Sequence, residues 1–338
     1  MQTMNLIEKE RLYPLLFEPV YKQVFWGGTK LASVLGRPIP SDAGPIGEAW
    51  EICDRPEVET AVLNGVLAGV SIHQLVLEYG RDFVGSSFRG GRFPLLVKLI
   101  DAGRRLSLQV HPSESVCARL RDASQPKSEM WYIIDADPGS IVFAGLKSSA
   151  TRQQFLTLMD SADVENLLQS FDSIPGDAYF INAGRIHTIG GGNLLLEIQQ
   201  NSDTTFRISD WNRTDEHGKI RELHIEKALS SIDFMDRTVS RIPGASNIAD
   251  HNRKYPLINR CPYFRTDELK LVEDWRDTTF STRSFHILTA INMPVTVENS
   301  RCRTELPVGA SCLIPACFGA YSIAVNPGTT STVIRTTL

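Results

Sequence analysis

The sequence contains no long apolar stretch and no leader-like beginning. No run among its 338 residues is apolar enough to cross a bilayer. The opening residues, MQTMNLIEKERLYPLLF, place charged side chains of both signs before any apolar run, whereas a signal peptide has a basic start followed by an apolar segment. We therefore expect a cytoplasmic protein with no membrane partner.

The sequence also lacks a basic excess and closely spaced cysteine pairs. A formal net charge of -4 at pH 7 argues against nucleic-acid binding, which depends on cationic contacts to phosphate, so we expect a small-molecule partner. The six cysteines are scattered and none forms a CxxC motif. This spacing is typical of free thiols in a reducing cytoplasm rather than of a metal or redox motif.

Short apolar runs broken by glycine, proline and asparagine dominate what the sequence does contain. They predict a mainly β protein with a few covering helices. We expect a catalytic domain with helical insertions over residues 1–257 and a C-terminal β-sandwich over 258–338. Helices are predicted after Ser113, a typical N-cap residue, over about 148–172, and over 221–232.

The segment LSLQVHP carries a polar trio at alternating positions. In a strand, Ser107, Gln109 and His111 share one face and the aliphatic residues between them share the other. A polar trio that faces the inside of a β-barrel needs hydrogen-bond partners, a ligand or a metal. A strand face exposed to solvent is the alternative.

Two later segments supply further polar groups. In KSEMWYIID, Lys127 and Glu129 can enter the same cavity, and a structural salt bridge is the alternative. His187 precedes a glycine cluster, where the backbone can approach a ligand closely. Gln109, His111, Glu129 and His187 together offer two imidazole nitrogens and two oxygens, a set suited to zinc in an open site.

The order and spacing of seven blocks make the sequence similar to type I mannose-6-phosphate isomerases, in their short bacterial form. The blocks are VFWGGTKL, PIGEAWEIC, FPLLVKLIDAGRRLS, QVHP, KSEMWY, GRIH and LLLEIQQNSDTTFR. The resemblance covers residues 14 to 235 strongly and the rest weakly. It implies a double-cupin fold, one Zn²⁺ per chain held by the four residues named above, and interconversion of D-mannose 6-phosphate and D-fructose 6-phosphate through a cis-enediolate.

The resemblance also suggests roles for other residues. Arg207 matches the family's active-site arginine, and its fork of donors suits an enediolate or a phosphate. In the alternating segment LLLEIQQ, Glu197 can project into the cavity as general base, with Asp203 and Lys127 as rivals. The candidates for phosphate binding are Ser107, Lys98 and Lys127, and those for further substrate contacts are Asp203, Glu48 and Trp50.

Two other functions are consistent with a cupin metal site. A cupin iron dioxygenase has two or three histidines and a carboxylate on the metal, but Gln109 as an oxygen ligand argues against that class. The second is a cupin metalloprotein that acts on or senses another sugar phosphate without this isomerisation. For the assembly we expect a monomer or a weak homodimer.

Overall fold

The computed structural model describes residues 12–40, 42–214, 218–245 and 249–338. The chain divides into two compact units. Unit 1 comprises Met1–Val20, Trp50–Leu96 and Ala245–Leu338, and unit 2 comprises Tyr21–Ala49 and Val97–Gly244. This division differs from the single boundary near residue 257 expected from the sequence, because residues 50–96 cluster with the C-terminal strands although they lie far from them along the chain.

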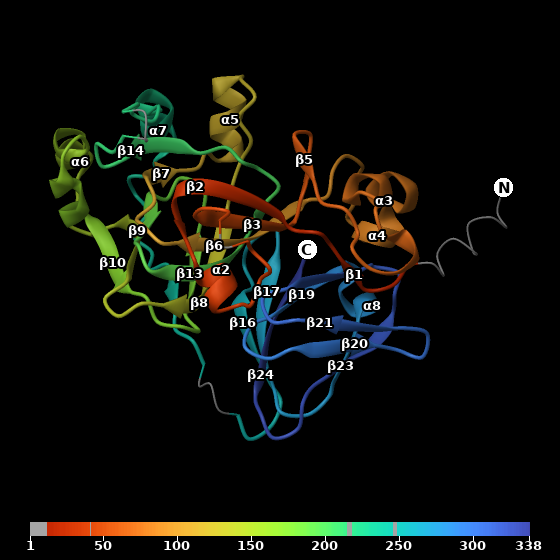
Figure 1. Ribbon diagram of the computed structural model, residues 1–338. Helices are drawn as coiled ribbons and strands as arrows, with labels where there is room; N and C mark the ends of the chain where they lie inside the picture. The colour runs from red at the N-terminus through yellow and green to blue at the C-terminus, as the bar shows by residue number, and fades with distance from the viewer. Residues whose placement is uncertain (1–11, 41, 215–217, 246–248) are drawn as a thin grey trace. The chain divides into compact units, whose positions relative to one another are not determined.

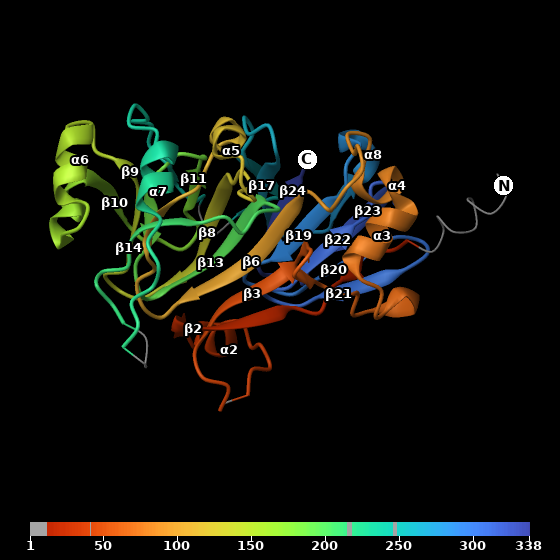
Figure 2. The same ribbon diagram turned by 90° about the horizontal axis from the view of Figure 1, so that it is seen from above.

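Unit 2 is built around two antiparallel sheets. The seven-stranded sheet has the order β15 (Arg241–Ile242), β11 (Ala178–Ile181), β8 (Glu129–Ala136), β13 (Asn193–Gln200), β6 (Leu95–Ala102), β2 (Val20–Gly28) and β3 (Ile46–Ile52). The five-stranded sheet has the order β10 (Leu168–Asp172), β9 (Ile141–Leu146), β12 (His187–Ile189), β7 (Leu108–Val110) and β14 (Phe206–Ser209). Figure 2 shows β8, β13 and β6 running side by side.

The two sheets of unit 2 face each other across an apolar core. Trp131 and Ile133 of β8 share one buried cluster with Val142 and Ala144 of β9. Phe143, between the last two, points to the opposite face of its sheet and belongs to a different cluster, as the two-residue period of a strand requires. That outer cluster includes residues of α6 (Arg152–Leu158) and α7 (Ile225–Ser231), which lie beside the five-stranded sheet in Figure 1.

The predicted helices of unit 2 are confirmed in two places and wrong in part of a third. Ser113 caps α5 (Glu114–Leu120), and α7 falls within the predicted range 221–232. The predicted helix over 148–172 ends early: α6 is followed by a 3-10 helix at Ala162–Leu167 and then by β10. Apolar residues at its end pair with β9 instead, Leu168 with Leu146 and Phe171 with Val142, so strand pairing overrides the helical pattern.

Unit 1 also contains two facing antiparallel sheets. The six-stranded sheet has the order β1 (Leu15–Leu16), β22 (Ser311–Ile314), β19 (His286–Ala290), β24 (Ser331–Thr337), β17 (Arg265–Leu271) and β16 (Arg253–Ile258), and the four-stranded sheet has the order β18 (Trp275–Thr278), β23 (Ala320–Ala324), β20 (Val295–Glu298) and β21 (Arg303–Leu306). Leu288 and Ile314 of the first sheet pack with Val297 and Ile323 of the second.

Smaller elements complete both units. Unit 1 contains the pair β4 (Asp54–Arg55) and β5 (Val58–Glu59), the 3-10 helix Gly65–Leu67, and the helices α3 (Ile72–Tyr79), α4 (Arg81–Val84) and α8 (Thr279–Thr282). Unit 2 adds α2 (Lys30–Ser33).

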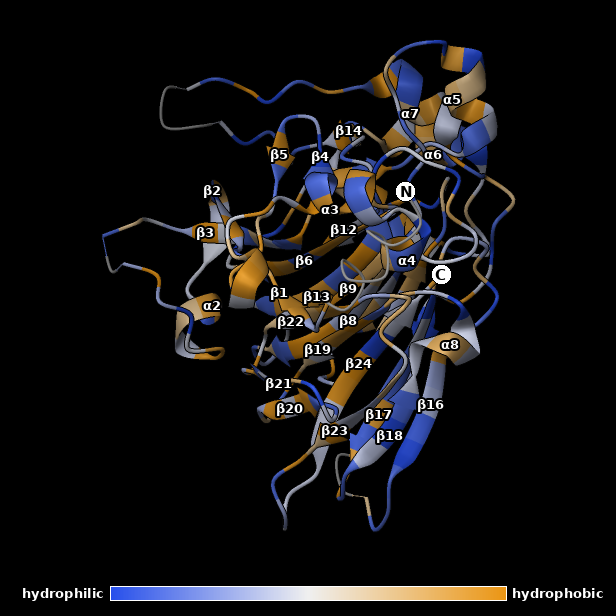
Figure 3. Ribbon diagram, turned by 90° about the vertical axis from the view of Figure 1, so that its right-hand side faces the viewer, coloured by the Kyte–Doolittle hydropathy of each residue, from blue (hydrophilic) through white to orange (hydrophobic). Residues whose placement is uncertain are grey.

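The edge strand β16 is largely hydrophilic in Figure 3, and its exposed Arg253 and Lys254 oppose pairing with other chains. Within the described ranges, no helix has both the length and the apolar character to cross a membrane. The predicted mainly β class is confirmed.

Candidate active site

Strand register in unit 2 brings three of the predicted site residues into one row. Gln109, in the middle of β7, pairs with His187 of β12 on one side and with Arg207 of β14 on the other. The aliphatic neighbours Leu108 and Val110 point into the outer cluster beneath the helices. The polar side chains therefore face the inside of the unit, and the alternative of a solvent-exposed strand face is wrong.

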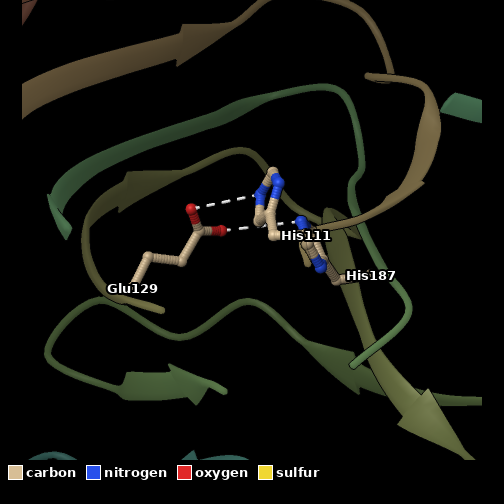
Figure 4. Close-up of side chains that lie close together, drawn as sticks. All are labelled: His111, Glu129 and His187. Carbon is tan, nitrogen blue, oxygen red and sulfur yellow. Dashed lines mark ion pairs between the residues drawn. The ribbon is translucent and has the colours of Figure 1, made fainter. Parts of the chain in front are cut away.

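The facing sheet supplies the carboxylate. Glu129 begins β8, and its two oxygens reach one histidine each: Oε2 lies 3.4 Å from His111 Nε2, and Oε1 lies 3.5 Å from His187 Nε2 (Figure 4). Gln109 completes the group, with its Nε2 atom 3.2 Å from His187 Nε2. The side chains of the two histidines and Glu129 are at most 1% exposed.

Several atoms of this group are buried without hydrogen bonds. Among the described residues, neither oxygen of Glu129 nor the Nε2 atom of His111 has a hydrogen-bond partner. They do form ion pairs, namely the two given above and one of 2.9 Å between Lys127 Nζ and Glu129 Oε2. Buried polar atoms in this condition are costly unless a ligand satisfies them. Their convergence on one point fits a metal ion.

The protonation states also suit a metal. The Nδ1 atoms of His111 and His187 lie 2.8 Å and 2.9 Å from the carbonyl oxygens of Thr204 and Arg185, so each ring donates there and turns the lone pair of Nε2 towards Glu129. Burial lowers the pKa of His187 to about 3 and also lowers that of His111. Both imidazoles are therefore neutral near pH 7, as metal ligands must be.

Gln109 can join the same group of ligands if its amide oxygen, rather than its amide nitrogen, faces His187. Its Nε2 faces His187, while Oε1 accepts a hydrogen bond of 3.3 Å from Ser107 Oγ. Rotating the amide by half a turn exchanges two groups of nearly equal size and turns the oxygen towards the histidine. The Ser107 hydroxyl can accept a hydrogen bond from the amide in that orientation.

Lysines and carboxylates surround this centre. Lys127 Nζ lies 2.9 Å from Glu129 Oε2 and 3.8 Å from Glu197 Oε1. Burial alone would raise the pKa of Glu129, but Lys127 and His111 outweigh burial and hold that pKa well below its usual range. The carboxylate is therefore ionised and ready to bind a cation.

Lys98 lies among three further carboxylates. Its Nζ atom is 3.3 Å from Glu48 Oε2, 3.6 Å from Asp203 Oδ1 and 3.8 Å from Glu197 Oε1. Burial would lower the pKa of Lys98, but these acidic neighbours prevail and raise it. For Glu197, burial prevails over the neighbouring charges. Burial raises the pKa of this carboxyl to about 7, the charge of Glu129 adds to the effect, and the two lysines oppose it.

These groups open onto a cavity of about 220 Å³ whose lining belongs entirely to unit 2. Eight predicted site residues line it: Glu48, Lys98, Ser107, Gln109, Lys127, Glu197, Asp203 and Arg207. Trp50 does not line the cavity, so its role as a substrate contact stays a prediction that this cavity does not support. It belongs to unit 1, where it is 4% exposed and packs with Cys53 and Leu96. A large aromatic residue within such a block is as well suited to core packing as to binding.

The sequence interpretation missed part of the lining. Trp26, Ile100, Leu106, Ile189, Thr205 and Arg221 also contribute. Trp26 stands in the block VFWGGTKL, where no pattern distinguishes a tryptophan that lines a cavity from one that packs in a core. No pattern in the sequence indicated Arg221, since it lies in a segment predicted as a helix and is placed by the chain path before α7.

Arg207 is anchored at one nitrogen. Its Nη1 atom donates a hydrogen bond of 2.7 Å to the carbonyl oxygen of Glu222, whereas its buried Nε atom has no hydrogen-bond partner among the described residues. Burial lowers the pKa of Arg207, and the positive charge of Arg221 adds to the effect. A guanidinium remains protonated under such conditions, so Arg207 presents a charge to the cavity.

A second group of potential metal ligands lies in unit 1 and has a structural explanation. Asp54, Glu59 and His73 come within reach of one another. Arg92, however, donates hydrogen bonds of 2.5 Å to Asp54 and 2.9 Å to Glu59. The guanidinium already supplies the positive charge that a metal would bring, so these residues form an ion-pair network.

Comparison with known proteins decides the family. A family model described as phosphomannose isomerase type I, catalytic domain, matches residues 15–144. The protein named "Probable mannose-6-phosphate isomerase GmuF" of Bacillus subtilis is 33% identical over 312 residues, which cover 92% of this chain and 96% of the relative. This chain belongs to the type I mannose-6-phosphate isomerase family. Mannose-6-phosphate isomerase ManA of Bacillus subtilis is 38% identical over 220 residues, 65% of this chain and 68% of ManA.

Solved structures of mannose-6-phosphate isomerases share the fold. The enzyme from Bacillus subtilis matches with a TM-score of 0.83 and 29% identity, over 96% of this chain and 99% of that one. The apo form of the enzyme from Salmonella typhimurium matches with a TM-score of 0.74 and 15% identity, over 96% of this chain and 98% of that one, which is a likeness of fold. The predicted double-cupin fold and the predicted membership of an isomerase family are confirmed.

Proposed function

We propose that this chain is a zinc-dependent isomerase that interconverts D-mannose 6-phosphate and D-fructose 6-phosphate. The observation that carries the proposal is the buried group of His111, Glu129 and His187, whose unsatisfied atoms converge beside a cavity containing both acids and cations. Membership of the mannose-6-phosphate isomerase family supports the substrate.

Zinc is the proposed metal, one ion per chain, held by Gln109, His111, Glu129 and His187. Neutral imidazoles and oxygen donors are a ligand set that zinc accepts in catalytic sites. When bound, zinc would act as a Lewis acid that polarises an oxygen of the open-chain sugar. It is needed for charge stabilisation rather than for electron transfer, since the reaction leaves the redox state of the sugar as a whole unchanged.

Glu197 is the proposed general base. With a pKa near 7 it is partly ionised at neutral pH and can exchange a proton with carbon efficiently. From mannose 6-phosphate it would take the proton from C2, leaving the electron pair in the new C1–C2 double bond of a cis-enediolate. Returning a proton to C1, while the O2 proton moves to O1, gives fructose 6-phosphate. Asp203 and Lys127 remain the rivals, but Asp203 is half exposed and Lys127 carries a positive charge beside Glu129.

The cationic side chains of the cavity are proposed to bind the phosphate or to stabilise the enediolate. Arg207 would stabilise the enediolate or bind the phosphate, because its charge faces the cavity with one nitrogen anchored. Ser107 and Lys127 remain proposed phosphate contacts. Lys98 is the weakest of these candidates, because three carboxylates already surround its ammonium group and would repel a phosphate dianion.

The reaction is tested by incubating the zinc-loaded chain with mannose 6-phosphate in D₂O and following the products by NMR. We expect fructose 6-phosphate that carries deuterium at C1, because a proton held by a carboxylate exchanges with solvent. Formation of product without deuterium, even at equilibrium, would contradict the enediolate. Binding of hexose phosphates without turnover would favour a cupin that senses another sugar phosphate. Action in the cytoplasm and a monomer or weak homodimer remain predictions.

A further inference from the structure

Trp131 lies at the point where the proposed base and the proposed metal site meet. It stands in the middle of β8, two residues after Glu129 and on the same face of the strand. The sheet register places it opposite Glu197 of β13 on one side and opposite Tyr179 of β11 on the other. Its side chain is fully buried and is absent from the cavity lining.

The indole nitrogen of Trp131 makes one specific contact. Nε1 donates a hydrogen bond of 3.1 Å to Glu197 Oε2. The other oxygen, Oε1, lies 3.8 Å from the Nζ atoms of both Lys98 and Lys127. The two oxygens of the carboxylate therefore have different surroundings, and tilting or rotating the carboxylate plane away from this orientation breaks the indole hydrogen bond.

The indole ring is itself fixed by its neighbours. It packs against the imidazole of His187 in a T-shaped arrangement, with ring centroids 5.4 Å apart and an interplanar angle of 73°. Tyr179 packs against it from another strand, at 6.4 Å. A tryptophan side chain has only two torsions. These ring contacts therefore fix the direction in which its N–H group points.

We infer that Trp131 is a positioning residue for the isomerisation, which holds the carboxylate of Glu197 through its indole N–H so that Oε1 faces the substrate. The inference rests on the proposed function and on Glu197 as the base. Trp131 touches no substrate, because it does not reach the cavity, and it acts through the orientation of Glu197.

The test compares Trp131→Phe with the wild type and with Tyr179→Phe, all loaded with zinc. Phenylalanine keeps an aromatic ring but removes the N–H donor, whereas Tyr179→Phe changes a neighbouring ring without touching Glu197. We expect Trp131→Phe to keep near-stoichiometric zinc and a similar KM but to lose about tenfold to hundredfold in kcat, the usual cost of a small misplacement of a reacting group. Tyr179→Phe should retain the kcat of the wild type.

A double-mutant cycle separates positioning from packing. In the Glu197→Gln background the base is absent, so adding Trp131→Phe should cost less than about twofold further. An additive loss, a loss of zinc from Trp131→Phe, or a full kcat in that variant would overturn the inference. If residual turnover of Glu197→Gln is too slow to measure, the acid limb of the kcat/KM profile of Trp131→Phe replaces the cycle, and it should move up by about one pH unit.

The contact is also tested without turnover. The protein has five tryptophans, each with one indole N–H signal in an NMR spectrum. The signal that is missing from the spectrum of Trp131→Phe is assigned to Trp131. This signal should shift and exchange faster with solvent in Glu197→Ala. An unchanged signal would overturn the inference whether or not the chain isomerises mannose 6-phosphate. If the wild type were inactive but the signal shifted in Glu197→Ala, the proposed function would be refuted and the Glu197–Trp131 contact would stand.

Discussion

Replacing Lys98 with methionine tests whether this lysine neutralises its acidic neighbours or binds substrate. Its side chain is 4% exposed, and its Nζ atom lies within 3.8 Å of carboxylate oxygens of Glu48, Glu197 and Asp203. Methionine has a similar length and no charge. The variant therefore keeps the packing and removes one positive charge from the middle of three negative ones.

The expected loss of stability is large. Two unit charges about 4 Å apart attract each other by about 4 kcal/mol near a protein surface, where the effective dielectric constant is about 20. Asp203 is 49% exposed and adds little, but Glu48 and Glu197 are much less exposed, at 20% and 7%. Removing one partner of a buried ion pair costs about 3–5 kcal/mol, and we expect Lys98→Met to lose that amount of unfolding free energy at neutral pH.

The loss should depend on pH in a definite direction. Without Lys98, the pKa of Glu197, already raised to about 7, rises further above its ordinary value of 4.5. Above pH 4.5 the folded variant then binds more protons than the unfolded chain does, so its stability falls as pH increases. The deficit relative to the wild type should consequently be smaller at about pH 5 than at about pH 8.

The assay is guanidinium-induced unfolding of the metal-free protein at these two pH values, with Lys98→Met/Glu48→Gln as the matched control. Removing one carboxylate should restore part of the lost stability. The reasoning would be refuted if Lys98→Met unfolded like the wild type at both pH values and only raised the KM for the hexose phosphate. In that case Lys98 would be a substrate contact, as the sequence first indicated.

Three further predictions concern the base, the arginine and the buried histidine of unit 1. Arg207→Ala should keep its zinc and lose about 10²–10³-fold in kcat, the usual cost of one charge-stabilising donor; full turnover by the zinc-loaded variant would remove Arg207 from the mechanism. In the wild type, kcat/KM should rise with pH as Glu197 ionises, because burial raises the pKa of this carboxyl above its usual range, and Glu197→Gln should abolish this limb; a limb that persists in the variant belongs to another group. Burial lowers the pKa of His286 to about 4, so the stability that its neutral form provides is complete above about pH 6.5 and is lost as pH falls towards 4. Urea unfolding of His286→Gln across this range should lack that loss, and an unchanged pH dependence would exclude His286 as its source.

Strand alternation accounts for what the sequence predicted well. Ser107, Gln109 and His111 point away from Leu108 and Val110, as a two-residue period requires, and this placed the polar trio inside the unit. The grouping with Glu129 and His187 followed from residue type and family resemblance.

The remainder depends on register between distant segments, which no local pattern contains. The pairing of Gln109 with His187 and of Trp131 with Glu197 is visible only in the folded sheets. Lys98 was predicted as an anion contact because no local pattern brings it to its carboxylate neighbours, which lie in two other segments of the chain, one with Glu48 and one with Glu197 and Asp203. The end of the predicted helix over 148–172 is wrong for the same reason, since Leu168 and Phe171 pair with residues of β9.

The central claim is that a metal held by Gln109, His111, Glu129 and His187 is required for isomerisation. The most direct measurement is made on one purified sample, prepared without chelator: metal content by mass spectrometry, and conversion of mannose 6-phosphate to fructose 6-phosphate before chelation, after chelation, and after zinc is restored. We predict near-stoichiometric zinc, loss of turnover on chelation and its recovery with zinc. Turnover that persists in metal-free protein, or bound zinc without any isomerisation, would contradict the account.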